Sequence, residues 1–305
     1  MIGARAVVAL ALAVVAGPAP AAAGPLPVVT TTSDLAALVR TVGGDRVAVS
    51  SLAPPLQDPH GVEIKPAHIA RLRQAALLVR VGLDHEPWLA RALATAGAPA
   101  PAGPRDLDAS RTIPLLQTET PRLLSDRAAP HLHGLGNPHY WLDPENARPI
   151  TAAVADALSR LVPADRTHFE RRRRSFLDRL DAGLARWRAA LQPYRGTRVV
   201  AVHDTWPYFA ARFGLVVVAT VEPAPGVPPS PAAIGALVER MRAAGIGIVL
   251  AEPYADPSLV RRLTEATGAR AVTLVPSVGG DSAAADYLAL FDLAVERLAS
   301  ALGPR

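Results

Sequence analysis

Three separated histidines in similar settings are the residues of this chain most suited to chemistry. His60 ends an Asp-Pro-His triplet, His139 lies in the stretch NPHYWLDP, and His203 follows the apolar run 199–202. Each lies at or just after the end of an expected strand, where a rigid sheet can hold a loop residue in place. Because the chain has no cysteine, neutral imidazole is the strongest zinc ligand available. Three imidazoles on three separate loops predict one converging metal site.

Short β-branched runs alternate with helical patterns along the chain, which predicts parallel α/β units. The fragments PAHIARLRQAALLVRVGLDHEPWLARAL and PAAIGALVERMRAAGIGIVLAEPYADPSLVRRL align element by element, so we expect two structurally related lobes. Ligands bind at the carboxyl ends of parallel strands in open α/β sheets, so the histidines should meet in the cleft between the lobes. Strands are expected at 28–31, 47–52, 77–81, 198–202, 216–221 and 246–250, with a weaker pattern at 112–116.

A long helical stretch separates the two halves. From 165 to about 191, apolar residues recur at spacings of three and four, which predicts one amphipathic helix. At 1.5 Å per residue it spans roughly 40 Å, enough to cross both lobes as a stiff connector that restricts wide hinge closure. We therefore expect an N-terminal lobe at 24–163, a connecting helix at 164–194 and a C-terminal lobe at 195–305.

The first residues have the features of an export signal. Arg5 precedes an apolar stretch at 6–16, and alanines at 21–23 provide a small-residue cleavage site, which together predict a cleavable signal peptide over 1–23. Without cysteine there is neither a disulfide framework nor a site for a lipid anchor. We expect a soluble, unlipidated, monomeric protein of the periplasm.

The net charge of +5 does not indicate a nucleic-acid partner. Nearly all basic residues are arginine, acidic residues are interleaved with them, and the densest cluster, 171–174, lies within a helical pattern. Such a cluster is typical of a solvated helix face, so no nucleic-acid binding is expected.

Over essentially the whole mature chain, the sequence resembles the periplasmic solute-binding proteins that deliver zinc or manganese to ABC importers. The matching stretches run from VVTTTSDLAALVR to VGLDHEPWL and include NPHYWLDPENA and VHDTWPYFAARFGL. The resemblance implies a rigid interlobe helix, a permease of the inner membrane as partner, and a periplasmic zinc chaperone as a second candidate partner. It also implies that His60 and His139 are the first two ligands and His203 the third. Histidine at the third position is typical of zinc carriers, whereas manganese carriers often have glutamate there.

The fourth ligand of that family is a carboxylate near the carboxyl end. Here the corresponding stretch VPSVGGD has no acid before Asp281, so Asp281 is the expected fourth ligand, with Asp286 and Glu252 as weaker candidates and water as another. Three imidazoles and one carboxylate form a closed tetrahedral set suited to Zn²⁺. Mn²⁺ prefers more oxygen ligands, so zinc is the expected transported ion.

Three further histidines and two alternative functions follow from the sequence. His131 and His133 stand where related zinc carriers have a histidine-rich insertion, and they either capture zinc weakly or belong to a plain loop. His85 lies between Asp84 and Glu86, where helix capping is the expected role of the acids. A secreted zinc-dependent hydrolase with Asp204 or Glu252 as base is the alternative function, although the chain has no HExxH motif. An adhesin or metal chaperone on the same fold is a third.

Overall fold

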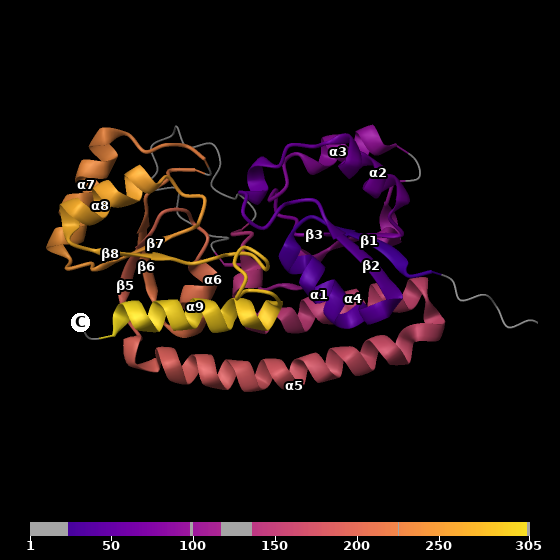
Figure 1. Cartoon of the computed structure of the whole chain (residues 1–305). Coiled ribbons are helices and arrows are strands. Elements are labelled where there is room, and N and C mark those ends of the chain that lie inside the picture. Colours follow the sequence, from indigo (N-terminus) through magenta and orange to yellow (C-terminus); the bar gives the residue numbers. More distant parts are fainter. Residues whose placement is uncertain (1–23, 98–99, 117–135, 225, 304–305) are drawn as a thin grey trace, which may run out of the picture.

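The computed structural model describes residues 24–97, 100–116, 136–224 and 226–303. These residues form two lobes, each built on a four-stranded parallel sheet (Figure 1). The first sheet has the order β2-β1-β3-β4 and the second the order β6-β5-β7-β8, so the two lobes repeat one topology. This confirms the expected α/β fold with two similar lobes. The strands are Leu26–Thr30 (β1), Val47–Ser51 (β2), Leu77–Arg80 (β3), Asp106–Asp108 (β4), Arg198–Ala201 (β5), Val216–Thr220 (β6), Ile248–Ala251 (β7) and Arg270–Thr273 (β8).

The fourth strand of the first sheet is not the one that the sequence predicted. Residues 112–116 are not a strand; β4 is the acidic segment Asp106–Asp108, which pairs with β3 in the register Leu78↔Asp106. Two aspartates in three residues argue against a strand on propensity alone. Here Arg80 of β3 forms ion pairs with both of them, at 3.0 and 3.1 Å. A tertiary contact thus offsets the unfavourable local sequence.

Helices connect the strands and cover both faces of each sheet. Several begin at a proline directly after a polar cap; for example, the side chain of Ser230 accepts a hydrogen bond from the amide of Ala233. The helices are Ser33–Gly43 (α1), Pro66–Gln74 (α2), Leu89–Ala96 (α3), Ala147–Leu161 (α4), Arg166–Leu191 (α5), Pro207–Phe213 (α6), Pro231–Ala243 (α7), Pro257–Thr267 (α8) and Tyr287–Leu302 (α9).

One apolar core runs through both lobes. It contains side chains from both sheets and from the helices beneath them, such as Val28 of β1, Phe176 of α5, Val199 of β5 and Phe291 of α9. Two smaller cores lie on the opposite faces, one beneath α2 and α3 and the other beneath α7 and α8. The lobes are therefore joined by packed side chains in addition to the chain that connects them.

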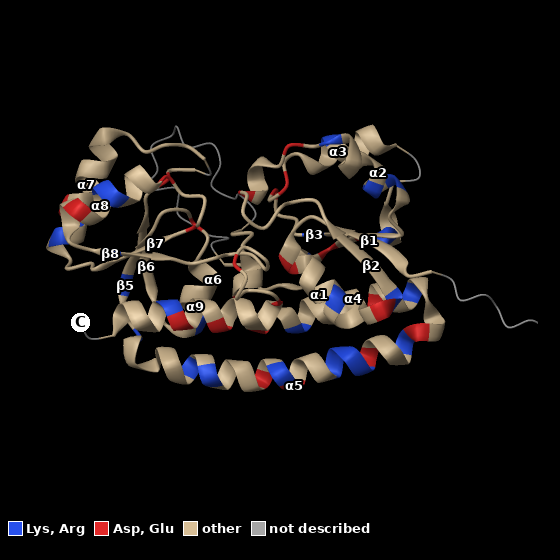
Figure 2. Cartoon of the chain, in the orientation of Figure 1, with Lys and Arg blue, Asp and Glu red and all other residues tan. Residues whose placement is uncertain are grey.

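The expected long helix is confirmed as α5, which runs along one side of the molecule below both lobes (Figure 1). It contacts α1 and α4 of the first half and α6 and α9 of the second. Its buried stripe consists of Phe169, Phe176, Leu180, Gly183, Leu184, Trp187 and Leu191. Charged residues, more of them basic than acidic, are spread along the rest of the helix (Figure 2), in line with a solvated face. The domain boundaries near 163 and 195 remain predictions.

Two sequence-based expectations fall outside the described residues. They are the signal peptide at 1–23 and the His131–His133 pair, which lies in 117–135. Among the residues that the structure does describe, no helix combines the length and the apolar character that a bilayer span requires.

Candidate metal centre

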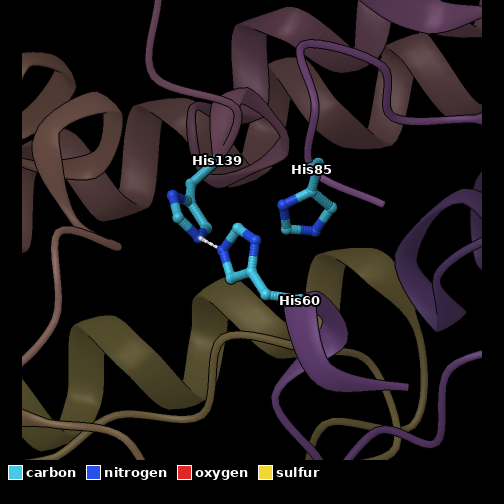
Figure 3. A group of neighbouring side chains, drawn as sticks. All are labelled: His60, His85 and His139. Atoms are coloured by element: carbon cyan, nitrogen blue, oxygen red, sulfur yellow. Dashed lines mark hydrogen bonds between the residues drawn. The ribbon is translucent and has the colours of Figure 1, made fainter. Parts of the chain in front are cut away.

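Three histidine side chains from the first half of the chain converge on one point. His60, His85 and His139 each offer a ring nitrogen, and these atoms all lie within 4.8 Å of one another (Figure 3). The Nε2 atoms of His60 and His139 are 3.4 Å apart. Two nitrogens bound at 2.0–2.1 Å to one tetrahedral zinc ion are separated by about 3.3–3.4 Å. The spacing of this pair therefore fits shared coordination of one ion.

His203 brings a fourth ring from the second lobe. Its ring centroid lies 5.6 Å from that of His60 and 5.3 Å from that of His139, and the His60 and His139 centroids are 5.4 Å apart. Imidazoles bound through Nε2 to one tetrahedral ion would have centroids about 5.2 Å apart. The ring nitrogens of His203 lie outside the 4.8 Å group, but its Nε2 is buried and has no hydrogen-bond partner among the described residues. The structure thus brings together the three histidines that the sequence singled out.

Short hydrogen-bonded turns hold His60 and His139 in place. His60 lies in the 3-10 turn Pro59–Gly61 after β2, and the carboxylate of Asp58 accepts a hydrogen bond from its backbone amide at 2.9 Å. The amide oxygen of Asn137 accepts a hydrogen bond from the backbone amide of His139 at 2.9 Å and lies 3.1 Å from its Nδ1. With Nδ1 as the donor to Asn137, Nε2 of His139 is the ring atom with the lone pair that could bind a metal.

Carboxylates surround His203 on the second lobe. Its Nδ1 lies 3.1 Å from a carboxylate oxygen of Glu222, which follows β6. Glu252, which follows β7, is 3% exposed and accepts a hydrogen bond from the indole of Trp206 at 2.8 Å. A carboxylate on the far nitrogen of a ligating imidazole fixes its tautomer and strengthens it as a donor.

The two lobes tune their imidazoles differently. Burial removes the hydration of the imidazolium and lowers the pKa of His60 to about 4. Burial also lowers the pKa of His203, but its hydrogen bond to Glu222 and the charges of Glu252 and Glu222 outweigh burial and raise it overall. At neutral pH, the imidazole of His60 is uncharged, and His203 lies in the region of the site with the more negative potential. A divalent cation would be favoured between them.

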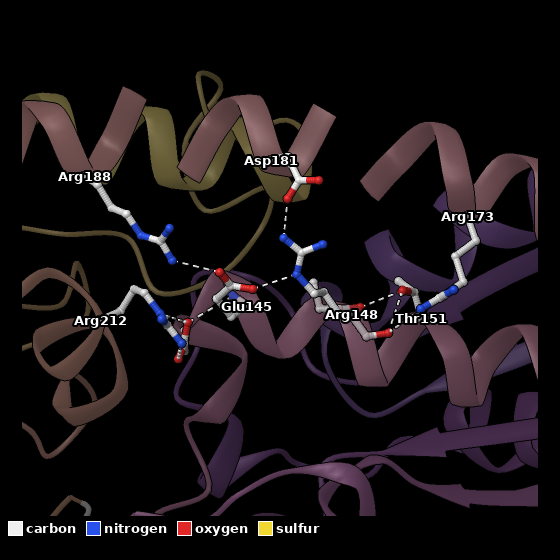
Figure 4. Close-up of polar contacts among 9 residues, drawn as sticks. Glu145, Arg148, Thr151, Arg173, Asp181, Arg188 and Arg212 are labelled. Carbon is white, nitrogen blue, oxygen red and sulfur yellow. Dashed lines mark hydrogen bonds and ion pairs between the residues drawn. The ribbon is translucent and has the colours of Figure 1, made fainter. Parts of the chain in front are cut away.

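An ion-pair network ties the segment after His139 to other elements (Figure 4). The carboxylate of Asp143 accepts two hydrogen bonds from Arg212 of α6, both at 2.7 Å, and one from the amide of Glu145 at 3.0 Å. Glu145 in turn pairs with Arg148 at 2.6 Å and with Arg188 of α5 at 2.8 Å. The motif that carries His139 is therefore anchored to the second lobe and to the long helix.

Asp281, the expected fourth ligand, is not part of the group of side chains that could hold a metal ion. Its carboxylate pairs with Arg297 of α9 at 2.6 Å and accepts a hydrogen bond from the amide of Ala283 at 2.9 Å. These two interactions lower its pKa. Asp286, a weaker candidate, caps α9 through the amides of Leu288 and Ala289. Among the described residues, the group that could hold a metal ion contains His85, which sequence reasoning did not place in the site.

The capping interpretation of the segment around His85 is wrong. The carboxylate of Glu86 accepts hydrogen bonds from the amides of Val81 and Gly82, at 2.7 and 3.1 Å, while α3 begins after Trp88 without a side-chain cap. His85 itself is fully buried. The signal that identified the other histidines was present here too, because His85 follows β3 just as His60 follows β2.

Comparisons with known proteins identify the family. The family described as zinc-uptake complex component A, periplasmic, matches residues 28–301. The chain belongs to this family. The resemblance drawn from the Asp-Pro-His and Pro-His-Tyr-Trp-Leu-Asp-Pro motifs is thereby confirmed.

Similar proteins carry related names. The high-affinity zinc uptake system protein ZnuA of Paracoccus denitrificans is 28% identical over 273 residues, covering 80% of this chain and 81% of that protein. ZnuA of Brucella abortus is 30% identical over 138 residues, and this match spans only 41% of the Brucella protein. A crystal structure of ZnuA superimposes with a TM-score of 0.76 at 26% identity, covering 91% of this chain and 99% of that one. FpvC of Pseudomonas aeruginosa in complex with Mn²⁺ gives 0.77 at 25% identity, covering 91% and 98%.

Proposed function

We propose that this protein is an extracytoplasmic zinc-binding protein that delivers Zn²⁺ to an ABC-type importer. The observation that carries the proposal is the convergence of His60, His139 and His203 from three loops and two lobes. Relatives named for high-affinity zinc uptake support transport as the purpose of the site. The permease of such an importer, in the inner membrane, is the partner to which the ion would pass. A periplasmic zinc chaperone is a candidate donor.

Zinc is proposed over manganese because of the donor atoms. The residues that converge are imidazoles, which suit zinc, whereas manganese favours carboxylate, carbonyl and water oxygens. Similar proteins have been solved with zinc, manganese and nickel bound, so the fold itself does not select the ion. Selection would then come from the residues around the site in this chain. Since the ion is cargo, the protein is proposed to be a carrier and not an enzyme.

The proposal predicts one tightly bound zinc ion per chain. His139→Ala combined with His203→Ala should weaken zinc binding by at least 100-fold, because the variant loses one ligand from each lobe. Competition with a chelating dye measures the affinity, and elemental analysis after purification without added metal identifies the ion. His68→Ala is the matched control, since His68 lies on α2 and hydrogen-bonds the amide of Lys65. Unchanged zinc affinity in the double variant would contradict the proposal.

A further inference from the structure

His85 is buried next to the rings of two other histidines, which packing alone does not require. It is fully buried, and its ring centroid lies 4.3 Å from that of His60 and 5.4 Å from that of His139. The ring of Trp141 lies 5.2 Å away on another side. A buried imidazole surrounded by two others forms a cluster of nitrogen donors, and such clusters bind transition metals.

The backbone that presents His85 is strained. Gly82, Leu83 and Asp84 have φ values of +81°, +56° and +57°, and the latter two are the only residues other than glycine with positive φ in the described part of the chain. A leucine in this region is sterically unfavourable. The carboxylate of Glu86 holds the turn by accepting hydrogen bonds from two backbone amides, and the amide of His85 closes it by donating to the carbonyl of Gly82 at 3.0 Å. Strain held in this way is typical of functional sites.

The turn that precedes His85 is also packed closely against the neighbouring strand. A Cβ at Gly82 would collide with the carboxylate of Asp108, so β4 packs directly against the turn. The order β1-β3-β4 puts the end of β3 in the middle of the sheet, beside the end of β1. From this position, the ring of His85 contacts the rings of His60 and His139.

We infer that His85 is the fourth metal ligand, so that the site consists of four imidazoles and no carboxylate. This inference rests on the proposed function and specifies its ligand set. In the structure, His60 and His85 are closer than two ligands of one ion, whose centroids would be about 5.2 Å apart, so their rings separate by about 1 Å on binding. Asp281 keeps its ion pair with Arg297.

A site with four neutral ligands has consequences for selectivity. No ligand charge offsets the charge of the ion, which leaves that role to Glu222 and Glu252 beside His203. Manganese binds nitrogen ligands weakly and prefers oxygen. The exchange of a carboxylate for an imidazole should therefore lower the affinity for manganese more than the affinity for zinc. Zinc should therefore bind this protein on the order of 1,000-fold more tightly than manganese.

X-ray absorption at the zinc edge on the loaded full-length protein tests the ligand set without any substitution. Four imidazole ligands and no oxygen are expected. His85→Gln should leave three imidazoles and weaken zinc binding by about 100-fold, with Asp281→Asn as the control that leaves both unchanged. Thermal unfolding of the metal-free variants separates loss of a ligand from loss of the fold.

The outcomes distinguish the inference from the function that it rests on. A wild-type spectrum with three imidazoles and an oxygen ligand, or a loss of affinity in Asp281→Asn with none in His85→Gln, would overturn the four-histidine site and leave the zinc carrier intact. If the wild-type protein bound no zinc tightly, the carrier itself would fail. Equal affinities for manganese and zinc would also count against an all-imidazole set.

Discussion

Asp143 shows how a single side chain can support the site without touching the metal. It lies four residues after His139 in the sequence, and its two-point ion pair with Arg212 joins the loop of one lobe to α6 of the other. Both groups are largely buried, with side-chain exposures of 12% and 29%. Such charge-assisted pairs are stronger than ordinary surface ion pairs, so Asp143 should matter for stability and for the position of His139.

Asp143→Asn should lower the free energy of unfolding by about 2 kcal/mol, because Arg212 loses its charged partner while the cap of the following turn is kept. Urea unfolding of the metal-free protein measures this loss. Glu239→Gln breaks the exposed pair between Glu239 and Arg242, whose side chains are 73% and 53% exposed, and should change stability by less than about 0.5 kcal/mol. Equal effects of the two substitutions would contradict the anchoring role.

Sequence reasoning reached three of the four clustered histidines through their local motifs, although the expectation that each follows a strand fails for His139. In the described residues, the strand before His139 is β4, which ends at Asp108. His60 and His139 each follow a proline, and His203 directly follows an apolar strand. His85 was missed because its acidic neighbours have the composition of a helix start. The roles of those neighbours depend on contacts that local sequence does not encode, namely the bonds of Glu86 to the amides of Val81 and Gly82. Asp281 was favoured for its place in the sequence, whereas Arg297 determines its place in space.

The same distinction holds for secondary-structure elements. Periodicity predicted α5 almost to the residue because its stripe extends over 26 residues, which averages out local exceptions. It failed for β4, a three-residue edge strand that is stabilised by Arg80 of its neighbour. Long elements with a repeating apolar pattern are thus predictable, while short edge elements depend on their partners.

At Gly183, close packing and helix propensity predict opposite effects of an alanine substitution on stability. Replacing a helical glycine with alanine usually stabilises by up to about 1 kcal/mol. At Gly183, however, a Cβ would lie 2.7 and 2.8 Å from ring atoms of Trp187, whose indole donates to Asp292 of α9 at 2.7 Å. Gly183→Ala should therefore destabilise the protein by about 1–3 kcal/mol, as measured by denaturant unfolding.

Gly235 provides a matched control for this prediction. It lies in α7, is exposed, and has open space within 4 Å of the position that a Cβ would take. Gly235→Ala should raise the free energy of unfolding by up to about 1 kcal/mol. If both alanines stabilised the protein, close contact between position 183 and the ring of Trp187 would not be what limits residue size at 183.

On the scale of the whole molecule, the lobes are joined by more than the long helix. The segment between β8 and α9 lies against the first lobe, where Asp34 of α1 accepts a hydrogen bond from the amide of Val278 at 2.9 Å. The indole of Trp141 donates to the carbonyl of Pro276 at 2.9 Å, and the phenol of Tyr287 donates to the carbonyl of Trp141 at 2.5 Å. Together with the shared core, these contacts predict that metal binding moves the lobes little. Small-angle scattering should show a radius of gyration that changes by less than about 1 Å on zinc loading.

Asp34 makes this junction sensitive to pH. Burial raises its pKa from 3.8 to about 7, against the opposing effect of the hydrogen bonds from Val278 and Ser277. The other titratable groups that interact with it are the phenols of Tyr254 and Tyr287, which stay neutral over this range because their pKa values are raised well above 10. A carboxyl group whose pKa is higher in the folded state binds its proton more tightly there. Its contribution to stability is therefore full below about pH 4 and is lost as the pH rises to about 7.

Asp34→Asn should remove the loss of stability between about pH 4 and pH 7. The amide oxygen can still accept the hydrogen bond from the amide of Val278, and no charge forms at this position. The variant should be less stable than the wild type near pH 4, where only the cost of the buried amide donor separates the two proteins, and should gain on the wild type steadily up to pH 7. Above pH 7 the gain should be constant at about 1–3 kcal/mol, since each pKa unit corresponds to about 1.4 kcal/mol and the buried amide donor costs part of the gain. Urea unfolding of both proteins at pH 5, 6 and 8 measures the difference. A gain that did not depend on pH would mean that Asp34 is not ionised at the lobe junction, and a loss at pH 8 would mean that its charge holds the lobes together.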